Sequence, residues 1–470
     1  MNQIPSLGFF PKGLFNKPKN QGDRSLDYEF IIKGPVPLIS FIQSSVDDRK
    51  TAKDGCLIVF FAPGRGTWSE TYAPFFPLFC LGWVTHEKSI ISTENRKNRK
   101  KETHVRTRSR LLWGAALPFI KLWIKNRYDL KIVGTFPEPP YILIANHTQD
   151  VDPFFLLSVI GKPVSFIINN AVFQNPVVSH VLRNMDMISK QKETSDLRTI
   201  YKVLKYIKSG RTVGIFAEGN ATWDGVSKNV YGGTSKLLDR GTIPIVAVRI
   251  SGGYLVNPRW ADKRRYGPIE LNIKEFSDSS ALDHIQQSDW EWQRKTGYLY
   301  KGSSRAAGIE RIIWFCPACQ AFSTVNAKGN DAYCFKCGNS WHISETGFIS
   351  GHSVHHVVKE QKKMLEQFLK ERQLKKDKEI GDAHLNMWHG KEKKKYVSGQ
   401  GRIIINDQSF ELAGNRFFYG KINALNTFMS TMLEFLYGPY LVRIKTRYNA
   451  FFLLNLIKTT RRWLQCFGKQ

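Results

Sequence analysis

The stretch YILIANHTQDVDPFFLLSVI, residues 141–160, decides the fold that this sequence predicts. Its apolar run ends at Ala145, a polar loop follows, and a helix is expected behind Asp152 because Pro153 suits a first helical position. A strand, a short loop and a helix in this order are typical of an α/β layer. His147 and Asp152 then lie at the end of a strand, where such sheets bind ligands.

The His147–Asp152 pair has two interpretations. An aspartate before a proline is an ordinary helix N-cap, and a cap needs no catalytic purpose. Alternatively, the carboxylate orients an imidazole that acts as a general base. The spacing of the two residues alone leaves both open, and a second motif is needed to decide.

The surrounding sequence alternates between apolar runs and helical patterns. Strands are predicted at residues 141–145, 164–168, 212–216 and 243–249, with a final strand near 269–273. Between them, apolar residues recur at helical spacing and a glycine follows as a C-cap: Leu197, Ile200, Val203, Leu204, Ile207 and Gly210. This alternation predicts an α/β fold with a mainly parallel sheet flanked by helices.

The chain of 470 residues is long enough for two or three domains. Residues 1–95 show no period, receive no assignment, and we expect much of that stretch to be loosely ordered. The α/β domain is assigned to 96–290, and a cysteine segment to 310–345. A charged helix is predicted at 357–380. A small β-rich module with a closing helix is predicted at 400–467, from short strand-like runs at 402–405, 409–412, 416–422 and 440–444.

The charge of the chain indicates an anionic partner. With 69 basic and 40 acidic residues the formal net charge is +29, which suits an anionic membrane surface or nucleic acid. Residues 96–110 carry eight basic residues and one acidic residue, and lead into an aromatic, apolar stretch at 111–128. Such a helix suits a bilayer interface, whereas a solvated linker followed by a core-packed helix is the alternative.

No run of about 18 apolar residues is present, so no transmembrane span is predicted. The N-terminus lacks the pattern of a signal peptide. Seven cysteines, four of them in two close pairs, fit a reducing compartment. We therefore expect a peripheral protein at the cytoplasmic face of a membrane.

A second motif, GIFAEGNATWDG at residues 214–225, follows the predicted strand at 212–216. Glu218 and Gly219 follow their strand as His147 follows its own, so we expect both loops to face one cleft. A Glu-Gly pair alone is an ordinary turn. Two polar motifs at two strand ends are much harder to obtain by chance.

With these motifs, residues 110–275 resemble the glycerolipid acyltransferase family of the 1-acylglycerol-3-phosphate type. The family's Asn-His-x-x-x-x-Asp block matches Asn146, His147 and Asp152. Its second block carries a basic residue after a strand, which MDMISKQKETSD resembles through Lys190 or Lys192.

The third block of the family, Phe-Pro-Glu-Gly-x-Arg-Ser, is matched by Phe216, Glu218 and Gly219, and the fourth by IPIVAV at 243–248. The chain departs from these blocks at three positions: Ala217 replaces a proline, Ala221 the arginine and Ala247 a second proline. In the family that arginine is thought to help hold the phosphate of the acceptor. Its absence leaves the identity of the acceptor open, and a lysine does not reproduce a planar guanidinium.

The resemblance implies an O-acyltransferase of phospholipid biosynthesis. It would move an acyl group from acyl-CoA or an acyl carrier protein thioester to the hydroxyl of a lysophospholipid. His147 would take the hydroxyl proton, and Asp152 would fix the imidazole tautomer. The implied substrate-binding residues are Asn146, Lys190, Lys192, Phe216, Glu218 and Gly219.

The cysteine segment has the spacing of a zinc ribbon. Cys316 and Cys319 form one pair, Cys334 and Cys337 the other, and 14 residues separate the pairs. Four thiolates would complete a structural zinc site, and Gly338 would allow the tight second turn. Two disulfides or four free thiols are the alternatives.

The segment at 400–467 resembles PH-like membrane-binding domains through its short strands and closing helix, although a scaffold module without a ligand fits as well. Two other classes of function compete with the enzyme. A lipid-binding or regulatory protein on the same fold would fit Ala221. A nucleic-acid-binding protein would use the zinc ribbon and basic runs, but His147 and Asp152 favour chemistry, so nucleic acid is the less favoured partner.

Overall fold

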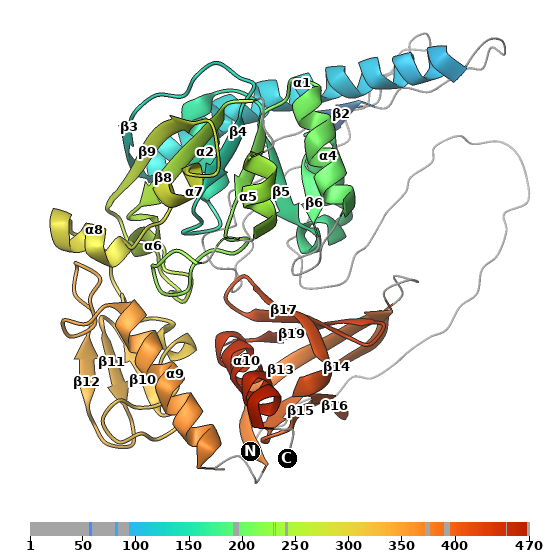
Figure 1. Ribbon diagram of the computed structural model, residues 1–470. Coiled ribbons are helices and arrows are strands. Elements are labelled where there is room, and N and C mark those ends of the chain that lie inside the picture. The colour runs from blue at the N-terminus through green and yellow to red at the C-terminus, as the bar shows by residue number, and fades with distance from the viewer. Residues whose placement is uncertain are drawn as a thin grey trace, which may run out of the picture.

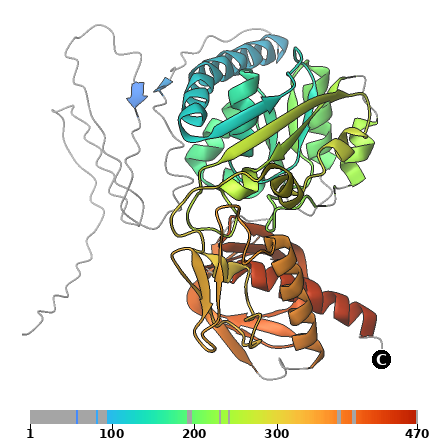
Figure 2. The same cartoon turned by 90° about the vertical axis from the view of Figure 1, so that its left-hand side faces the viewer.

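The computed structural model describes residues 56–58, 80–82, 94–190, 197–228, 230, 232–239, 243–371, 377–389, 395–447 and 449–467. Lys192 and almost all of the unassigned segment 1–95 lie outside these ranges. The described part contains an α/β domain, a cysteine segment with one long helix, and a β-rich module with another (Figure 1). Figure 2 shows the two smaller bodies below the α/β domain.

The α/β domain is built on one sheet of seven strands. They are β3 Asp129–Val133, β4 Ile142–Ala145, β5 Ser165–Asn169, β6 Ile188–Lys190, β7 Val213–Phe216, β8 Ile245–Ser251 and β9 Pro268–Phe276. Their spatial order is β3-β9-β8-β4-β7-β5-β6. All neighbouring pairs are parallel except β8 and β9. The predicted α/β fold with a mainly parallel sheet is confirmed.

Helices cover both faces of this sheet. They are α1 Glu94–Arg127, α2 Asp152–Ile160, α3 Pro176–Asn184, α4 Leu197–Lys208, α5 Gly232–Leu238, α6 Gly253–Val256, α7 Ala281–His284 and α8 Asp289–Thr296. Side chains of β4 alternate between two cores because successive residues of a strand point to opposite faces. Leu143 and Ala145 join the core with α1 and α2, whereas Ile142 and Ile144 join the core with α4, α5 and α7.

The start of α2 differs by one residue from the prediction. Asp152 is the first residue of the helix, and Val151 occupies the N-cap position without a side-chain hydrogen bond. The predicted N-cap role of Asp152 is therefore wrong. Its carboxylate instead turns back to the preceding loop, where Thr148 and Gln149 donate to it.

Helix α1 packs one face into the core. Trp113, Ile120 and Ile124 are buried, whereas Leu111 and Leu122 are 71% and 58% exposed. The core-packed alternative therefore describes one face of this helix, and contact of the other face with a membrane stays a prediction. Within the described residues, no helix has the length and apolar character that crossing a bilayer requires.

The cysteine segment holds a three-stranded sheet of β10 Val325–Lys328, β11 Asp331–Cys334 and β12 Ser340–His342. Helix α9, Val354–Lys370, follows it. The charged helix predicted at 357–380 is thus shorter at its C-terminal end, and the chain is already in strand β13 at Lys378.

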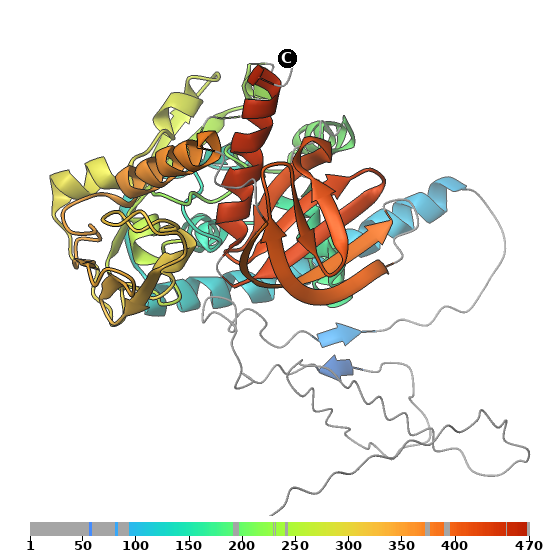
Figure 3. The same ribbon diagram turned by 90° about the horizontal axis from the view of Figure 1, so that it is seen from below.

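The C-terminal module is a second seven-stranded sheet, in which every pair is antiparallel. Its strands are β13 Lys378–His389, β14 Lys395–Ile405, β15 Ser409–Leu412, β16 Asn415–Phe418, β17 Ile422–Phe428, β18 Met432–Tyr437 and β19 Tyr440–Thr446. The order β16-β15-β14-β13-β19-β18-β17 joins the first strand to the last. Helix α10, Ala450–Phe467, lies against one side of these strands (Figure 3). The PH-like interpretation of this module stays a prediction.

Candidate active site

The loops that carry the two motifs meet at one edge of the sheet. Strands β4 and β7 are parallel neighbours, with Ala145 opposite Phe216. The backbone N–H of His147 donates to Glu218 Oε1 at 3.1 Å, and that of Thr222 donates to the carbonyl of His147 at 2.9 Å. Because parallel strands bring their carboxyl ends together, the motifs come into direct contact.

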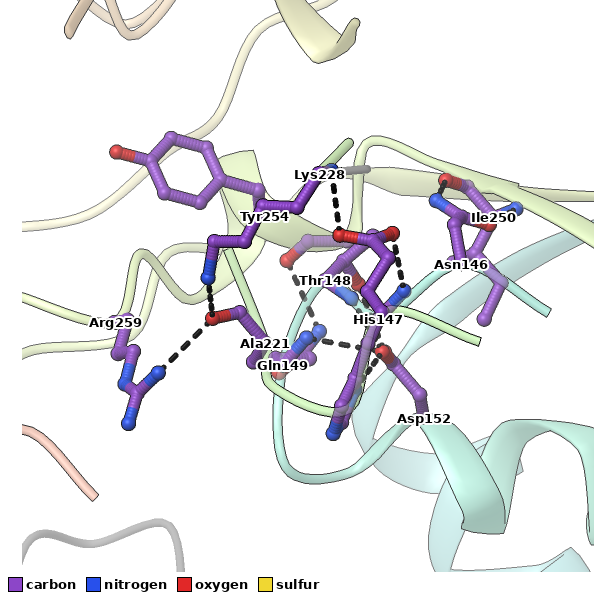
Figure 4. A network of polar contacts seen from close by, with 12 residues as sticks. Asn146, His147, Thr148, Gln149, Asp152, Ala221, Lys228, Ile250, Tyr254 and Arg259 are labelled. Carbon is purple, nitrogen blue, oxygen red and sulfur yellow. Dashed lines mark hydrogen bonds and ion pairs between the residues drawn. The ribbon is translucent and has the colours of Figure 1, made fainter. Parts of the chain in front are cut away.

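His147 and Asp152 form a hydrogen-bonded pair. Nδ1 of His147 lies 2.9 Å from Oδ2 of Asp152 (Figure 4). Thr148 donates to Asp152 through its backbone N–H at 2.6 Å and its hydroxyl at 2.8 Å, and the N–H of Gln149 donates at 3.0 Å. These donors stabilise an ionised carboxylate although Asp152 is fully buried. An ionised Asp152 places the proton of a neutral imidazole on Nδ1 and leaves Nε2 as an acceptor.

Phe216 supports the imidazole from one face. Its ring lies 4.5 Å from the His147 ring, centroid to centroid, with an interplanar angle of 29°. The side chain of His147 is 15% exposed, so an external group can reach it. Within the described residues, the ring nitrogen opposite Asp152 has no hydrogen-bond partner. The imidazole is therefore held in place with Nε2 available.

Glu218 connects the two loops through its carboxylate. One oxygen accepts from the N–H of His147, and the other accepts from the N–H of Lys228 at 2.9 Å. Burial raises the pKa of Glu218, although both backbone hydrogen bonds oppose that shift. Gly219 follows with φ of 71°, a left-handed conformation that glycine adopts without steric cost. Glu218 thus has a structural function at this edge, and contact of Glu218 and Gly219 with a substrate stays a prediction.

Asn146 fixes the end of β4 to β8. Its side-chain amide donates to the carbonyl of Ile250 at 2.8 Å, and its side-chain oxygen accepts from the Ile250 N–H at 2.7 Å. The residue is buried. These two bonds account for its place beside His147, and substrate binding by Asn146 stays a prediction.

Two basic residues that the sequence analysis did not single out lie at Ala221. The Nζ atom of Lys228 donates to the Ala221 carbonyl at 3.2 Å, and the guanidinium of Arg259 donates to the same oxygen at 2.9 Å (Figure 4). Part of the Lys228 side chain is accessible, yet burial of its ammonium group, together with the charge of Arg259, lowers its pKa to about 8. No motif in the sequence marks either residue.

Asp289, at the start of α8, is a buried acid near this edge, also unmarked by any sequence motif. It accepts from the backbone N–H groups of Gly252 and Tyr254 at 2.9 and 3.1 Å. Burial raises its pKa to about 6. Asp289 and His147 line the same small cavity.

Of the predicted basic residues of the second block, the structure describes Lys190. Lys190 ends β6, which β7 and β5 separate from β4. Lys192 is outside the described residues. The structure therefore does not bring Lys190 into contact with His147, and phosphate binding by either lysine stays a prediction.

The four predicted cysteines gather in the cysteine segment, with all Sγ atoms within 4.8 Å of one another. The Sγ atoms of Cys316 and Cys337 lie 3.6 Å apart, and those of Cys319 and Cys334 lie 3.9 Å apart. Four sulfurs around zinc, at about 2.3 Å from the metal, lie about 3.8 Å from one another, so the residues fit a zinc ion. Gly338 has φ of 78°, which allows the expected tight turn.

Comparisons with known proteins agree with the position of these motifs. An acyltransferase family model matches residues 127–251. A chloroplastic 1-acyl-sn-glycerol-3-phosphate acyltransferase of Brassica napus is 24% identical over 151 residues, which cover 31% of this chain and 42% of the relative. A 1-acyl-sn-glycerol-3-phosphate acyltransferase of Borreliella burgdorferi is 25% identical over 148 residues, covering 29% of this chain and 58% of the relative.

The chain thus spans about half the length of the curated relatives it matches. Among solved structures, the 1-acyl-sn-glycerophosphate acyltransferase PlsC of Thermotoga maritima aligns with a TM-score of 0.31 and 19% identity, covering 41% of this chain and 79% of PlsC. The residues that the family model matches contain both strand-end motifs. Residues 127–251 of this chain thus match an acyltransferase family model, and the chain is similar over about 150 residues to two 1-acyl-sn-glycerol-3-phosphate acyltransferases.

Proposed function

We propose that this protein transfers a fatty acyl group from an acyl thioester to the hydroxyl of a lysophospholipid, with a 1-acylglycerol-3-phosphate as the expected class of acceptor. The observation that carries the proposal is the His147–Asp152 pair, with Nε2 of the imidazole free to accept a proton. The two curated relatives named for this reaction support the choice of acceptor.

The reaction requires a hydroxyl to lose its proton as it attacks the thioester. His147 accepts that proton at Nε2 while the hydroxyl oxygen bonds to the acyl carbon, and Asp152 stabilises the resulting imidazolium. The carbon–sulfur bond then breaks. The released thiolate takes the proton from His147 and leaves as a thiol. No covalent intermediate on the protein is needed, because the acceptor itself is the nucleophile.

The test is transfer of a labelled acyl group by the purified full chain to lysophosphatidic acid, other lysolipids and monoacylglycerol, with acyl-CoA and acyl carrier protein thioesters as donors. We expect His147→Ala to lower kcat roughly 100- to 10,000-fold while keeping the wild-type circular dichroism spectrum. His180→Ala is the matched control, since His180 is exposed on α3. A folded, fully active His147→Ala protein, or a wild type that acylates no acceptor, would contradict the proposal.

We also propose that Cys316, Cys319, Cys334 and Cys337 hold a structural zinc ion. The closeness of their four sulfurs supports this. Four thiolates fill a tetrahedral site, so the metal would stabilise the ribbon and take no part in acyl transfer.

Finally, we propose that the protein acts at the cytoplasmic face of a membrane, as a peripheral protein bound to an anionic surface. The net charge of +29 and the exposed side chains of Leu111 and Leu122 on α1 support this proposal. Each basic residue near an anionic leaflet contributes about 1 kcal/mol.

A further inference from the structure

The C-terminal module reaches the loop that follows Glu218. The end of β17 and the turn that follows it, residues 424–431, contact the loop at residues 219–228. We call residues 424–431 the β17–β18 turn and residues 219–228 the site loop. The side-chain amide of Asn220 donates to Asn426 Oδ1 at 2.9 Å, and the indole N–H of Trp223 donates to the hydroxyl of Thr427 at 3.3 Å. Asn426 and Thr427 are 3% and 2% exposed, so these contacts are buried.

Arg259 joins the site loop to this turn. Its guanidinium donates to the carbonyl of Ala221 at 2.9 Å on one side. On the other side it donates to the carbonyls of Thr427 at 3.0 Å and Met429 at 2.8 Å. A planar guanidinium presents donors in fixed directions, so Arg259 sets the distance and angle between the two segments.

Stacking strengthens the same contact. The guanidinium of Arg259 lies 4.6 Å from the ring centroid of Trp223. The other partner of Trp223 is Phe451 of α10, with ring centroids 4.3 Å apart and an interplanar angle of 13°. The site loop is therefore held by both the β17–β18 turn and the closing helix of the module.

The turn has an unusual backbone shape at this contact. The pairing of β17 and β18 shifts register between Asn423 and Asn426. Ala424 and Met429 have φ of 49° and 56°, a left-handed conformation that is strained for non-glycine residues. Bulges re-aim side chains and are common next to functional sites. Here the bulge and the two strained residues flank the side chains that contact the site loop.

We propose that Arg259 is a positioning residue through which the C-terminal module fixes the site loop and, with it, the acceptor side of the acyltransferase site. This inference rests on the proposed acyl transfer. Ala221 stands where the family block has arginine, and its carbonyl receives the cationic groups of Arg259 and Lys228. Positive charge at this point favours an acceptor with an anionic phosphate head group.

The test compares the full chain carrying Arg259→Ala or Arg259→Lys with Arg264→Ala. Arg264 is the matched control because it also donates to a backbone carbonyl, that of Arg127, and lies over a tyrosine ring. We expect Arg259→Ala to raise the KM for lysophosphatidic acid roughly 10- to 100-fold, with smaller changes in kcat and in the KM of the thioester. Arg259→Lys should recover part of the loss, and Arg264→Ala should keep the wild-type KM.

A second pair of variants changes the turn from the other side. Met429→Pro is incompatible with a φ of 56° and should raise the same KM, whereas Met429→Gly accepts that φ and should leave it unchanged. An unchanged acceptor KM in both Arg259→Ala and Met429→Pro would overturn the proposal. So would equal losses of kcat and melting temperature in Arg259→Ala and Arg264→Ala, because they would indicate a general effect on stability.

Hydrogen exchange separates this proposal from the proposed function. The amides of residues 219–228 should exchange faster in Arg259→Ala than in the wild type, and Arg264→Ala should leave them unchanged. Hydrogen exchange can be measured without any enzymatic activity. A wild type that acylates no acceptor would refute acyl transfer, and the exchange rates would still test whether Arg259 positions the site loop. Equal exchange in all three proteins would refute positioning by Arg259.

Discussion

The carboxylate of Asp152 accepts hydrogen bonds from the ring of His147, from the backbone N–H groups of Thr148 and Gln149, and from the Thr148 hydroxyl. One side chain thus orders the whole loop between β4 and α2 and orients the imidazole within it. A carboxylate with several donors stays ionised in a buried place, where an isolated charge would be costly.

Asp152→Asn tests both functions of this carboxylate. An uncharged amide cannot stabilise the imidazolium. Its NH2 group is a donor and cannot accept the hydrogen bonds that Thr148 and Gln149 donate. We expect kcat to fall roughly 100- to 10,000-fold. The free energy of unfolding should fall by about 1–3 kcal/mol relative to the wild type. Steady-state kinetics and urea denaturation measure the two effects. Wild-type kcat in a folded variant would contradict the orienting function.

The lowered pKa of Lys228 should make the stability of the protein depend on pH. This pKa is about 8 in the folded protein, mainly because of burial, against 10.5 for an ordinary lysine. Between these values the unfolded chain binds the proton and the folded protein does not, so stability rises with pH over that interval. Relative to Lys228→Met, the wild type should gain up to about 3 kcal/mol between pH 8 and 10.5. Denaturation of both proteins at several pH values measures this, and parallel curves would contradict it.

Among the individual site residues, the sequence predicted those that follow strands. His147, Asp152 and Glu218 were found because each stands just beyond an apolar run, and the structure brings them together. Arg259 and Lys228 were missed, since their position depends on how loops fold over the sheet. Neither lies in a pattern that distinguishes it from the many basic residues of this chain.

The central strands β4, β7 and β8 of the α/β sheet were predictable because both of their faces are buried, which gives short continuous apolar runs. The edge strand β3, which is half-buried to exposed, was missed. In the C-terminal module, β13 was missed. It begins in a charged stretch, and a register shift between Glu379 and Gly381 interrupts its alternation. β18 was missed as well, although its sequence MLEFLY is mostly apolar. The predicted run 416–422 is in fact the end of β16, a short 3₁₀ turn and the start of β17.

The zinc ribbon predicts one bound metal ion. Zinc measured after purification without added metal should be about one per chain, and Cys316→Ser should lose most of it. The melting temperature should fall in this variant, because metal binding contributes to the folding free energy of such sites. Cys466→Ser is the control, since this cysteine is outside the ribbon sequence. Zinc far below one per chain would favour the disulfide or free-thiol alternatives.

The whole molecule carries a charge that should act at a membrane surface. We expect the full chain to sediment with vesicles containing phosphatidylserine and to stay in solution with vesicles of phosphatidylcholine alone. Added salt should release it, because exposed charges are screened. The double change Leu111→Glu and Leu122→Glu should weaken binding, since both side chains are exposed on α1. Equal binding to both kinds of vesicle would contradict the electrostatic part of the proposal.

Composition and spacing predicted the three main bodies but not how they touch. The contact of the C-terminal module with the site loop consists of backbone carbonyls, one arginine and stacked rings, and none of these has a signature in sequence. Which surfaces meet depends on shapes that exist only after each body has folded.

The contacts of the site loop also have a consequence for the order of folding. Asn220 and Trp223 bind residues 206 and 204 positions later in the chain, whereas the bond between His147 and Glu218 spans 71 positions. Closing a longer stretch of chain loses more conformational entropy, so distant contacts form late. The central strands can pair while the ribosome is still making the β-rich module. We therefore expect the contacts of the site loop to form only after Thr427 and Phe451 have been made, later than the bond between His147 and Glu218.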